Sequence, residues 1–265
     1  MRKPERMRFV PALSIIFCLL APLPQLLAQD LRIAAASDLQ FAMTDLVSGF
    51  EKKTSKRIDV SYGSSGNFRA QIANGAPFDV FFSADVQYPN MLIAAGLADR
   101  DSLHIYAHGR LVLWAPPGSN LQLDKRGLAV LKSNRINKIA IANPDHAPYG
   151  RAAVAALQEA GLYNDVKAKL VYGENISQAA QFAESGSAQV GILALSLTYA
   201  DSMKNGERWE VPQNLYPPME QAAVIISASK NKATASAFLD YVRSPGGTEV
   251  LAKYGFTVGA SAQKP

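Results

Sequence analysis

Residues 33–38 read IAAASD, an apolar run that ends in small residues and a hydroxyl, and this pattern decides the fold. Three later stretches repeat it: VSYGSSG at 60–66, IANPDHAPYG at 141–150 and LVYGENIS at 170–177. Each stretch predicts a buried strand, a loop of small or polar residues and the start of a helix. Strands that alternate with helices are typical of a mostly parallel sheet flanked by helices. We therefore predict an α/β protein with four strand-to-helix junctions, two in each half of the chain.

Junctions of this kind suit a small oxyanion. The first N–H groups of a helix lack intrahelical partners, and the helix start carries a partial positive charge. Hydroxyls at Ser37, Ser64, Ser65 and Tyr149 add directed donors. Ligands of open α/β sheets bind beyond the carboxyl ends of the strands. The sequence therefore predicts that the four junctions hold one anion without the help of lysine or arginine.

Each of these residues also has an ordinary structural interpretation. Ser37 is typical of a helix cap, and Ser64 and Ser65 beside glycines are typical of a turn. Asp38 and Glu174 would repel an anion, so we expect both to cap helix starts and to point away from the ligand. The fourfold recurrence of the junction favours the anion site over these separate interpretations.

The first 28 residues have the pattern of a secretory signal peptide. A basic start precedes an apolar run at residues 10–20, and a stretch that contains proline ends at Ala28. We expect cleavage after Ala28 and export to the periplasm. The single cysteine, Cys18, lies inside this leader. The mature chain is therefore expected to have no disulfide, thiolate metal site or cysteine nucleophile.

The mature chain is large for one core, so we expect two lobes. No low-complexity linker separates them, which indicates that the chain crosses between the lobes within strands, near residues 107–110 and 218–223. We assign residues 29–108 plus 224–265 to lobe 1 and residues 109–223 to lobe 2. The leader holds four of the 27 basic residues, and no dense basic run remains after it. Nucleic-acid binding is therefore not expected.

The chain resembles the periplasmic molybdate-binding proteins of ABC importers over nearly its whole mature length. The motifs that carry the resemblance are AAAS at 34–37, SS at 64–65, APFDVFFSAD at 76–85, NPDHAPYG at 143–150 and YGFT at 254–257. The resemblance implies a type II periplasmic-binding-protein fold whose two α/β lobes close on molybdate or tungstate. It also implies a monomer that serves a membrane permease, with no cofactor and no enzymatic activity.

The same resemblance assigns ligand contacts. Ser37 and Ser65 correspond to serine ligands of the first lobe, Tyr149 to a contact after the third junction and Ile176 to a backbone N–H at the fourth. The metal would be held as its oxyanion through these four residues, with Ser64 and Asp38 as secondary contacts. Two departures are visible. Asp38 is an insertion relative to some members, and Ala194 stands where some members carry a tyrosine that Tyr149 is expected to replace.

Other functions remain open at this point. A site for phosphate or sulfate would use the same junctions, and protonated phosphate needs an acceptor that Asp38 could supply. A secreted serine hydrolase would pair Ser64 or Ser65 with His104, His108 or His146, but the GSSG stretch does not fit the Gly-x-Ser-x-Gly elbow. We expect His146 to face solvent, and the chain not to be an enzyme. A purely structural or adhesive domain would leave the four junctions unexplained.

Overall fold

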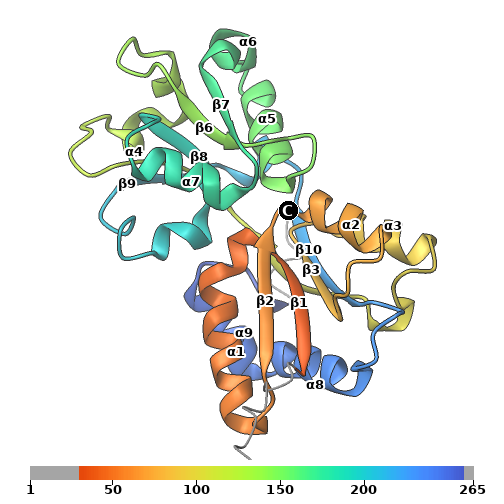
Figure 1. Ribbon diagram of the computed structural model, residues 1–265. Coiled ribbons are helices and arrows are strands. Elements are labelled where there is room, and N and C mark those ends of the chain that lie inside the picture. Colours follow the sequence, from red (N-terminus) through yellow and green to blue (C-terminus); the bar gives the residue numbers. More distant parts are fainter. Residues whose placement is uncertain (1–29, 260–265) are drawn as a thin grey trace, which may run out of the picture.

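The computed structural model describes residues 30–259, and the signal peptide expected at residues 1–28 lies outside that range. The chain forms two lobes, each built on one five-stranded sheet with helices around it (Figure 1). This architecture confirms the α/β class and the two-lobe fold.

The first sheet has the order β2-β1-β3-β10-β4. β1 runs parallel to β2 and β3, whereas β10 runs antiparallel to β3 and β4. The five strands are β1 (Leu31–Ala36), β2 (Ile58–Gly63), β3 (Val80–Ser83), β4 (His104–Gly109) and β10 (Met219–Ile225). Around them lie α1 (Gln40–Thr54), α2 (Ser65–Ala73), α3 (Gln87–Ala94), α8 (Lys232–Arg243), α9 (Pro245–Lys253) and the short 3-10 helices η1 (Ser37–Leu39) and η2 (Arg100–Ser102).

Alternate residues of β1 face opposite sides of this sheet, as the period of a strand requires. Ile33 and Ala35 pack with the apolar faces of α1, α8 and α9, and Ala34 packs with the residues under α2 and α3. Because both faces are covered, β1 is apolar at nearly every position. The helices on both faces hold the end of β1, and thus Ser37, in a fixed place.

The second sheet repeats the arrangement with the order β7-β6-β8-β5-β9. β6 runs parallel to β7 and β8, and β5 runs antiparallel to β8 and β9. The strands are β5 (Leu111–Ala115), β6 (Ile139–Ala142), β7 (Leu170–Gly173), β8 (Val190–Ala194) and β9 (Glu207–Glu210). Its helices are α4 (Leu123–Arg126), η3 (Gly127–Lys132), α5 (Pro148–Glu159), α6 (Tyr163–Val166), η4 (Lys167–Lys169), α7 (Ile176–Glu184), η5 (Leu195–Tyr199) and η6 (Gln213–Leu215).

The chain crosses between the sheets twice. Arg110 alone separates β4 from β5, and residues 211–218 separate β9 from β10. All of Met219–Ile225 pairs within the first sheet. The expected lobe boundary at residue 224 therefore cuts a strand, and placing residues 219–223 in lobe 2 was wrong. Glu220 and Gln221 interrupt the apolar pattern near the beginning of this strand, so the sequence did not reveal where the strand starts.

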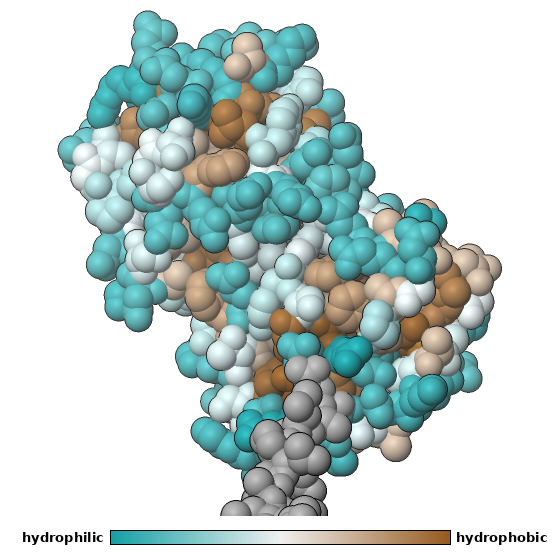
Figure 2. Space-filling view, viewed as in Figure 1, coloured by the Kyte–Doolittle hydropathy of each residue, from teal (hydrophilic) through white to brown (hydrophobic). Residues whose placement is uncertain are grey.

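The surface is largely hydrophilic on the face shown in Figure 2, with apolar residues in separate patches. Among residues 30–259, no helix combines the length and the apolar character that a membrane span needs. The buried apolar residues instead form one cluster in the second lobe and two clusters on the faces of the first sheet.

Candidate oxyanion-binding site

The four junctions meet at one small cavity between the lobes. Its volume is about 10 Å³, so the cavity is small. The residues that line it come from both lobes: Ala36, Ser37, Asp38, Gly63, Ser64, Ser65, Ala84, Ala147, Pro148, Tyr149 and Ile176. All six residues that the sequence analysis named for the site are among them.

Three helices begin at this cavity. α2 begins at Ser65, α5 at Pro148 and α7 at Ile176, and the strand β1 delivers Ser37 in the short helix η1. Pro148 suits the first position of a helix, because the N–H group that proline lacks would have no partner there. The helix starts therefore direct the positive ends of their dipoles toward the place where the lobes meet.

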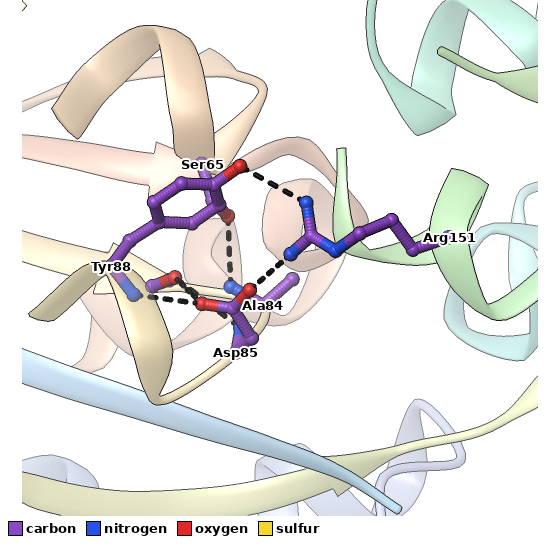
Figure 3. A network of polar contacts seen from close by, with 6 residues as sticks. Ser65, Ala84, Asp85, Tyr88 and Arg151 are labelled. Carbon is purple, nitrogen blue, oxygen red and sulfur yellow. Dashed lines mark hydrogen bonds and ion pairs between the residues drawn. The ribbon is translucent and has the colours of Figure 1, made fainter. Parts of the chain in front are cut away.

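Ser65 is fully buried and is oriented by the backbone of the next strand. Its Oγ accepts a hydrogen bond from the Ala84 N–H at 3.0 Å, as Figure 3 shows beside the inter-lobe network. A hydroxyl that accepts in this way keeps its own proton for another acceptor. Ser65 can therefore donate to an oxyanion in the cavity without breaking this bond.

Ser64 caps α2 and also contacts the opposite lobe. Its Oγ accepts from the Asn67 N–H at 3.4 Å and lies 2.9 Å from Nδ1 of His146. The expectation that His146 faces solvent was wrong. The turn that contains His146 folds against α2, and its carbonyl accepts from the Gly66 N–H at 2.9 Å.

Ser37 joins the first junction to the fourth. Its hydroxyl lies 3.2 Å from Oδ1 of Asn175, to which it donates, and it accepts from the Ser177 N–H at 3.3 Å. Ser177 Oγ also donates to the Ser37 carbonyl at 3.0 Å. An anion that accepts a hydrogen bond from the Ser37 hydroxyl must therefore replace Asn175 as the acceptor of that bond. Asn175 keeps a second role, since its side chain caps α7 by accepting from Gln178 N–H.

Asp38 does not cap a helix, contrary to expectation. Its carboxyl is buried beside the cavity, where Oδ2 accepts from Nε2 of Gln221 at 2.6 Å. The same Nε2 lies 3.2 Å from the Tyr149 hydroxyl. Burial raises the pKa of Asp38 to about 6, against the hydrogen bond from Gln221 and the nearby Tyr149 hydroxyl, which both favour the carboxylate. Asp38 is thus a buried acid whose pKa lies closer to neutral pH than is usual for aspartate, within a group of polar side chains.

Tyr149 and Gln221 approach each other at the crossing between the sheets. A Cβ on Gly109 would lie 2.5 Å from the Tyr149 hydroxyl and 2.6 Å from Nε2 of Gln221, so only glycine leaves them room. Burial raises the pKa of Tyr149 well above its usual value, and the phenol stays a neutral donor. Ala194, at the end of β8, is buried and carries no group that could contact an anion.

Glu174 was also expected to cap a helix, and it does not. Its Oε1 accepts from Nδ2 of Asn67 at 3.1 Å across the lobes, while Asn175 supplies the cap of α7. A second polar link joins the lobes next to Ala84, one of the lining residues. Arg151 from α5 forms an ion pair with Asp85 and donates to the Tyr88 hydroxyl at 3.0 Å (Figure 3). These contacts hold the lobes together around the site.

The lining of the cavity is electrically unusual for an anion site. Within residues 30–259 it includes no lysine or arginine, and Arg151, whose contacts join the lobes nearby, is paired with Asp85. Positive potential must come from helix starts and hydroxyls. Such neutral donors can hold an anion without an ion pair that must break on release.

The geometry gives little support to a hydrolase. His146 meets Ser64, but across the described residues no carboxylate hydrogen-bonds to His146 to orient it as a base. The Ser64 oxygen is also engaged by the start of α2. Within residues 30–259, no group of three or more histidine, cysteine or acidic side chains could hold a metal ion.

Several residues that build the site were missed in the sequence. Gln221, Asn175, Ser177 and Arg151 connect the lobes or orient lining groups. Gln221 left a usable signal, because a glutamine inside the otherwise apolar run of a central strand must find buried partners. Arg151 left none, since an arginine on a helix surface is ordinary.

Comparison with known proteins identifies the family of the chain. Residues 31–257 match the family model described as bacterial extracellular solute-binding protein. The molybdate-binding protein ModA of Azotobacter vinelandii is 43% identical over 231 residues, which cover 86% of this chain and 90% of that protein. ModA of Rhodobacter capsulatus is 38% identical over 245 residues, 92% of this chain and 94% of that protein.

Solved structures extend the likeness to three dimensions. The periplasmic molybdate-binding protein of Azotobacter vinelandii aligns with a TM-score of 0.81 at 36% identity, over 86% of this chain and 99% of that one. The sulfate-binding protein SubI of Mycobacterium tuberculosis H37Rv aligns with a TM-score of 0.71 at 16% identity, over 88% of each chain, and shares the fold. The relatives with high identity are binding proteins and not enzymes. The chain therefore belongs to the bacterial extracellular solute-binding proteins, in the group that contains the ModA proteins.

Proposed function

We propose that this protein captures molybdate, or the similar tungstate, as a tetrahedral oxyanion between its two lobes. Ser37, Ser65 and Tyr149 would donate through side-chain hydroxyls, and Ile176 through its backbone N–H, with Ser64 and Asp38 as secondary contacts. The observation that carries the proposal is the convergence of these residues on one small cavity that has no basic side chain. The names of the relatives favour molybdate over other tetrahedral anions.

The lobes would act as a clamp. The anion contacts both lobes only when they are closed, so it shifts the population toward the closed form. We further propose that the signal peptide is cleaved and that the mature protein works in the periplasm as a monomer. There it would deliver the anion to a permease of an ABC import system, without a cofactor and without nucleic acid.

A competitive titration tests the proposed ligand. Mature protein is titrated calorimetrically with molybdate, tungstate, sulfate and phosphate at the same pH and ionic strength. We expect molybdate and tungstate to bind with similar affinity and to displace sulfate and phosphate. Tighter binding of sulfate or phosphate than of molybdate would overturn the proposal.

Phosphate is the second candidate, because of one observation. Asp38 lines the cavity with one carboxyl oxygen that has no hydrogen-bond partner. An ionised Asp38 could accept a hydrogen bond from the hydroxyl of a hydrogen phosphate ion, whereas the molybdate dianion has no hydroxyl to donate. If phosphate is the ligand, Asp38→Asn should weaken phosphate binding and leave molybdate binding intact.

A further inference from the structure

The buried carboxyl of Asp38 has one satisfied oxygen and one unsatisfied oxygen. Oδ2 accepts from Gln221, whereas Oδ1 is buried and has no hydrogen-bond partner among residues 30–259. An unpaired buried carboxylate oxygen costs free energy, because nothing replaces the water that it loses. The residue is only 1% exposed and lines the anion cavity. An anion in the cavity therefore lies beside a carboxyl group whose Oδ1 can still form a hydrogen bond.

Gln221 fixes which oxygen can carry a proton. The Tyr106 hydroxyl lies 2.8 Å from Oε1 of Gln221, to which it donates. With its oxygen turned to Tyr106, Gln221 presents its amide nitrogen to Asp38 and Tyr149. Since Oδ2 accepts from that nitrogen, a proton on Asp38 belongs on Oδ1.

Among residues 30–259, the lining of the cavity offers no lysine or arginine that could offset a second negative charge. Asp38 meets Gln221 from β10, Tyr106 from β4 and Tyr149 from α5, and its backbone carbonyl accepts from Ser196 Oγ of η5 at 2.7 Å. A second acid, Asp85, also raises the pKa of Tyr106 through its negative charge, and it is itself paired with Arg151. An ionised Asp38 next to a dianion would therefore face electrostatic repulsion that no neighbouring cation offsets among residues 30–259.

We propose that Asp38 takes up one proton when a tetrahedral dianion enters the cavity, and that Oδ1 then donates a hydrogen bond to the anion. This inference rests on the proposed function and adds a proton to its binding equilibrium. The proton comes from solvent, stays on Oδ1 while the anion is bound and returns when the anion leaves. No bond of the anion changes.

The free protein is poised for this exchange. Because burial raises the pKa of Asp38 to about 6, the free site is mostly protonated below that pH and mostly ionised above it. Binding below about pH 5 then needs no proton uptake. Above about pH 7 each bound dianion takes up one proton, and the apparent dissociation constant rises about tenfold per pH unit.

The test counts protons during the binding of sodium molybdate. Mature protein is titrated calorimetrically at pH 7.5 in pairs of buffers with different ionisation enthalpies, and the dissociation constant is measured from pH 5 to 8.5. We expect close to one proton taken up per molybdate at pH 7.5, and an affinity that falls as the pH rises above about 6.

Asp38→Asn places a neutral amide donor in the same position. This variant should take up almost no proton, bind molybdate with little dependence on pH and bind more tightly than the parent protein at pH 8. The control is Asp59→Asn on the exposed edge of β2, which should keep the proton uptake of the parent. Because the proton count of the unmodified protein is itself informative, the test does not depend on the folding of the variant.

The outcomes separate the two proposals. Binding of molybdate without proton uptake at pH 7.5, or equal uptake by Asp38→Asn, would overturn the role of Asp38 and leave the proposed function in place. Absence of molybdate binding at every pH from 5 to 8.5 would overturn the proposed function, and this inference with it.

Discussion

At the scale of single residues, the hydroxyls and helix starts were predictable and their partners were not. Ser37, Ser65, Tyr149 and Ile176 follow strands in the sequence, and the carboxyl ends of strands in one sheet meet at one edge. Asp38 was placed wrongly, because an acid before a helix is usually a cap, and nothing local shows that Gln221, far along the chain, will bind it. His146 was misplaced for the same reason, since its partner Ser64 belongs to the other lobe.

Removal of the Ser65 hydroxyl should weaken anion binding. Ser65→Ala deletes a buried donor that is already oriented by Ala84, so we expect a loss of about 1–3 kcal/mol in the binding free energy, the usual cost for a hydrogen bond to a charged group. Calorimetric titration with molybdate measures it. Ser61→Ala, on the exposed part of β2, serves as the matched control and should bind as the parent does. An unchanged dissociation constant for Ser65→Ala would remove Ser65 from the site.

Asp38 should also affect the stability of the protein without ligand. Its pKa is raised from 3.8 to about 6 by folding, so the folded state binds more protons than the unfolded state between these values. The free energy of unfolding therefore falls as the pH rises through this window, by up to about 3 kcal/mol in total. Urea unfolding of Asp38→Asn and parent should agree near pH 4, and the variant should be more stable at pH 7.5. Equal stability at both pH values would show that Asp38 is not desolvated.

At the scale of elements, the strands and helices around the site were predicted because their apolar patterns are local. The strand β4 and the edge strand β9 were missed, since polar residues interrupt them, as in the histidines of His104–Gly109 and the charges of Glu207–Glu210. Their hydrogen bonds come from neighbours in the sheet, β10 and β5 respectively. Sequence patterns do not reveal such pairing, because it depends on strands that are distant in the chain.

The start of α2 should be sensitive to a single methyl group. A Cβ on Gly66 would lie 2.7 Å from the His146 carbonyl oxygen of the opposite lobe, which is too close for contact. Gly66→Ala should therefore weaken molybdate binding by about 1–3 kcal/mol, as overpacking of a tight contact does. The thermal stability of the free protein should not fall, because alanine favours a helix more than glycine does.

Gly246→Ala is the control for Gly66→Ala, since a Cβ there meets no atom within 4 Å. It should bind molybdate as the parent does. If Gly66→Ala also bound normally, the contact between α2 and the turn of His146 would not belong to the bound form.

At the scale of the whole molecule, the two lobes share one plan. In each sheet, a strand that leads into a junction lies between two parallel neighbours: β1 in the first sheet and β6 in the second. The last two strands of each sheet, β10 with β4 and β5 with β9, pair antiparallel. Two lobes were predictable from size and from the spacing of the junctions. The exact crossing was not, because Met219–Ile225 had to be recognised as one strand of the first sheet.

Closure around the anion should change the shape of the molecule in solution. Since the donors lie on both lobes, we expect small-angle scattering of mature protein to show a smaller radius of gyration after addition of molybdate. Gly66→Ala should show a smaller decrease at the same degree of saturation. A radius of gyration that is unchanged in the parent protein would mean that the lobes are already closed without the anion. Binding would then not shift the population toward the closed form.

The ion pair of Arg151 with Asp85, together with the bond from Arg151 to Tyr88, joins the two lobes beside Ala84, which lines the cavity. An anion enclosed behind such contacts leaves only after they part, so its residence time depends on a residue that never touches it. Arg151→Gln should therefore speed dissociation while the association rate stays nearly constant, as is usual when a contact forms late. Stopped-flow kinetics measures both rates. The residence time of the anion would then depend on contacts between the lobes that do not touch it.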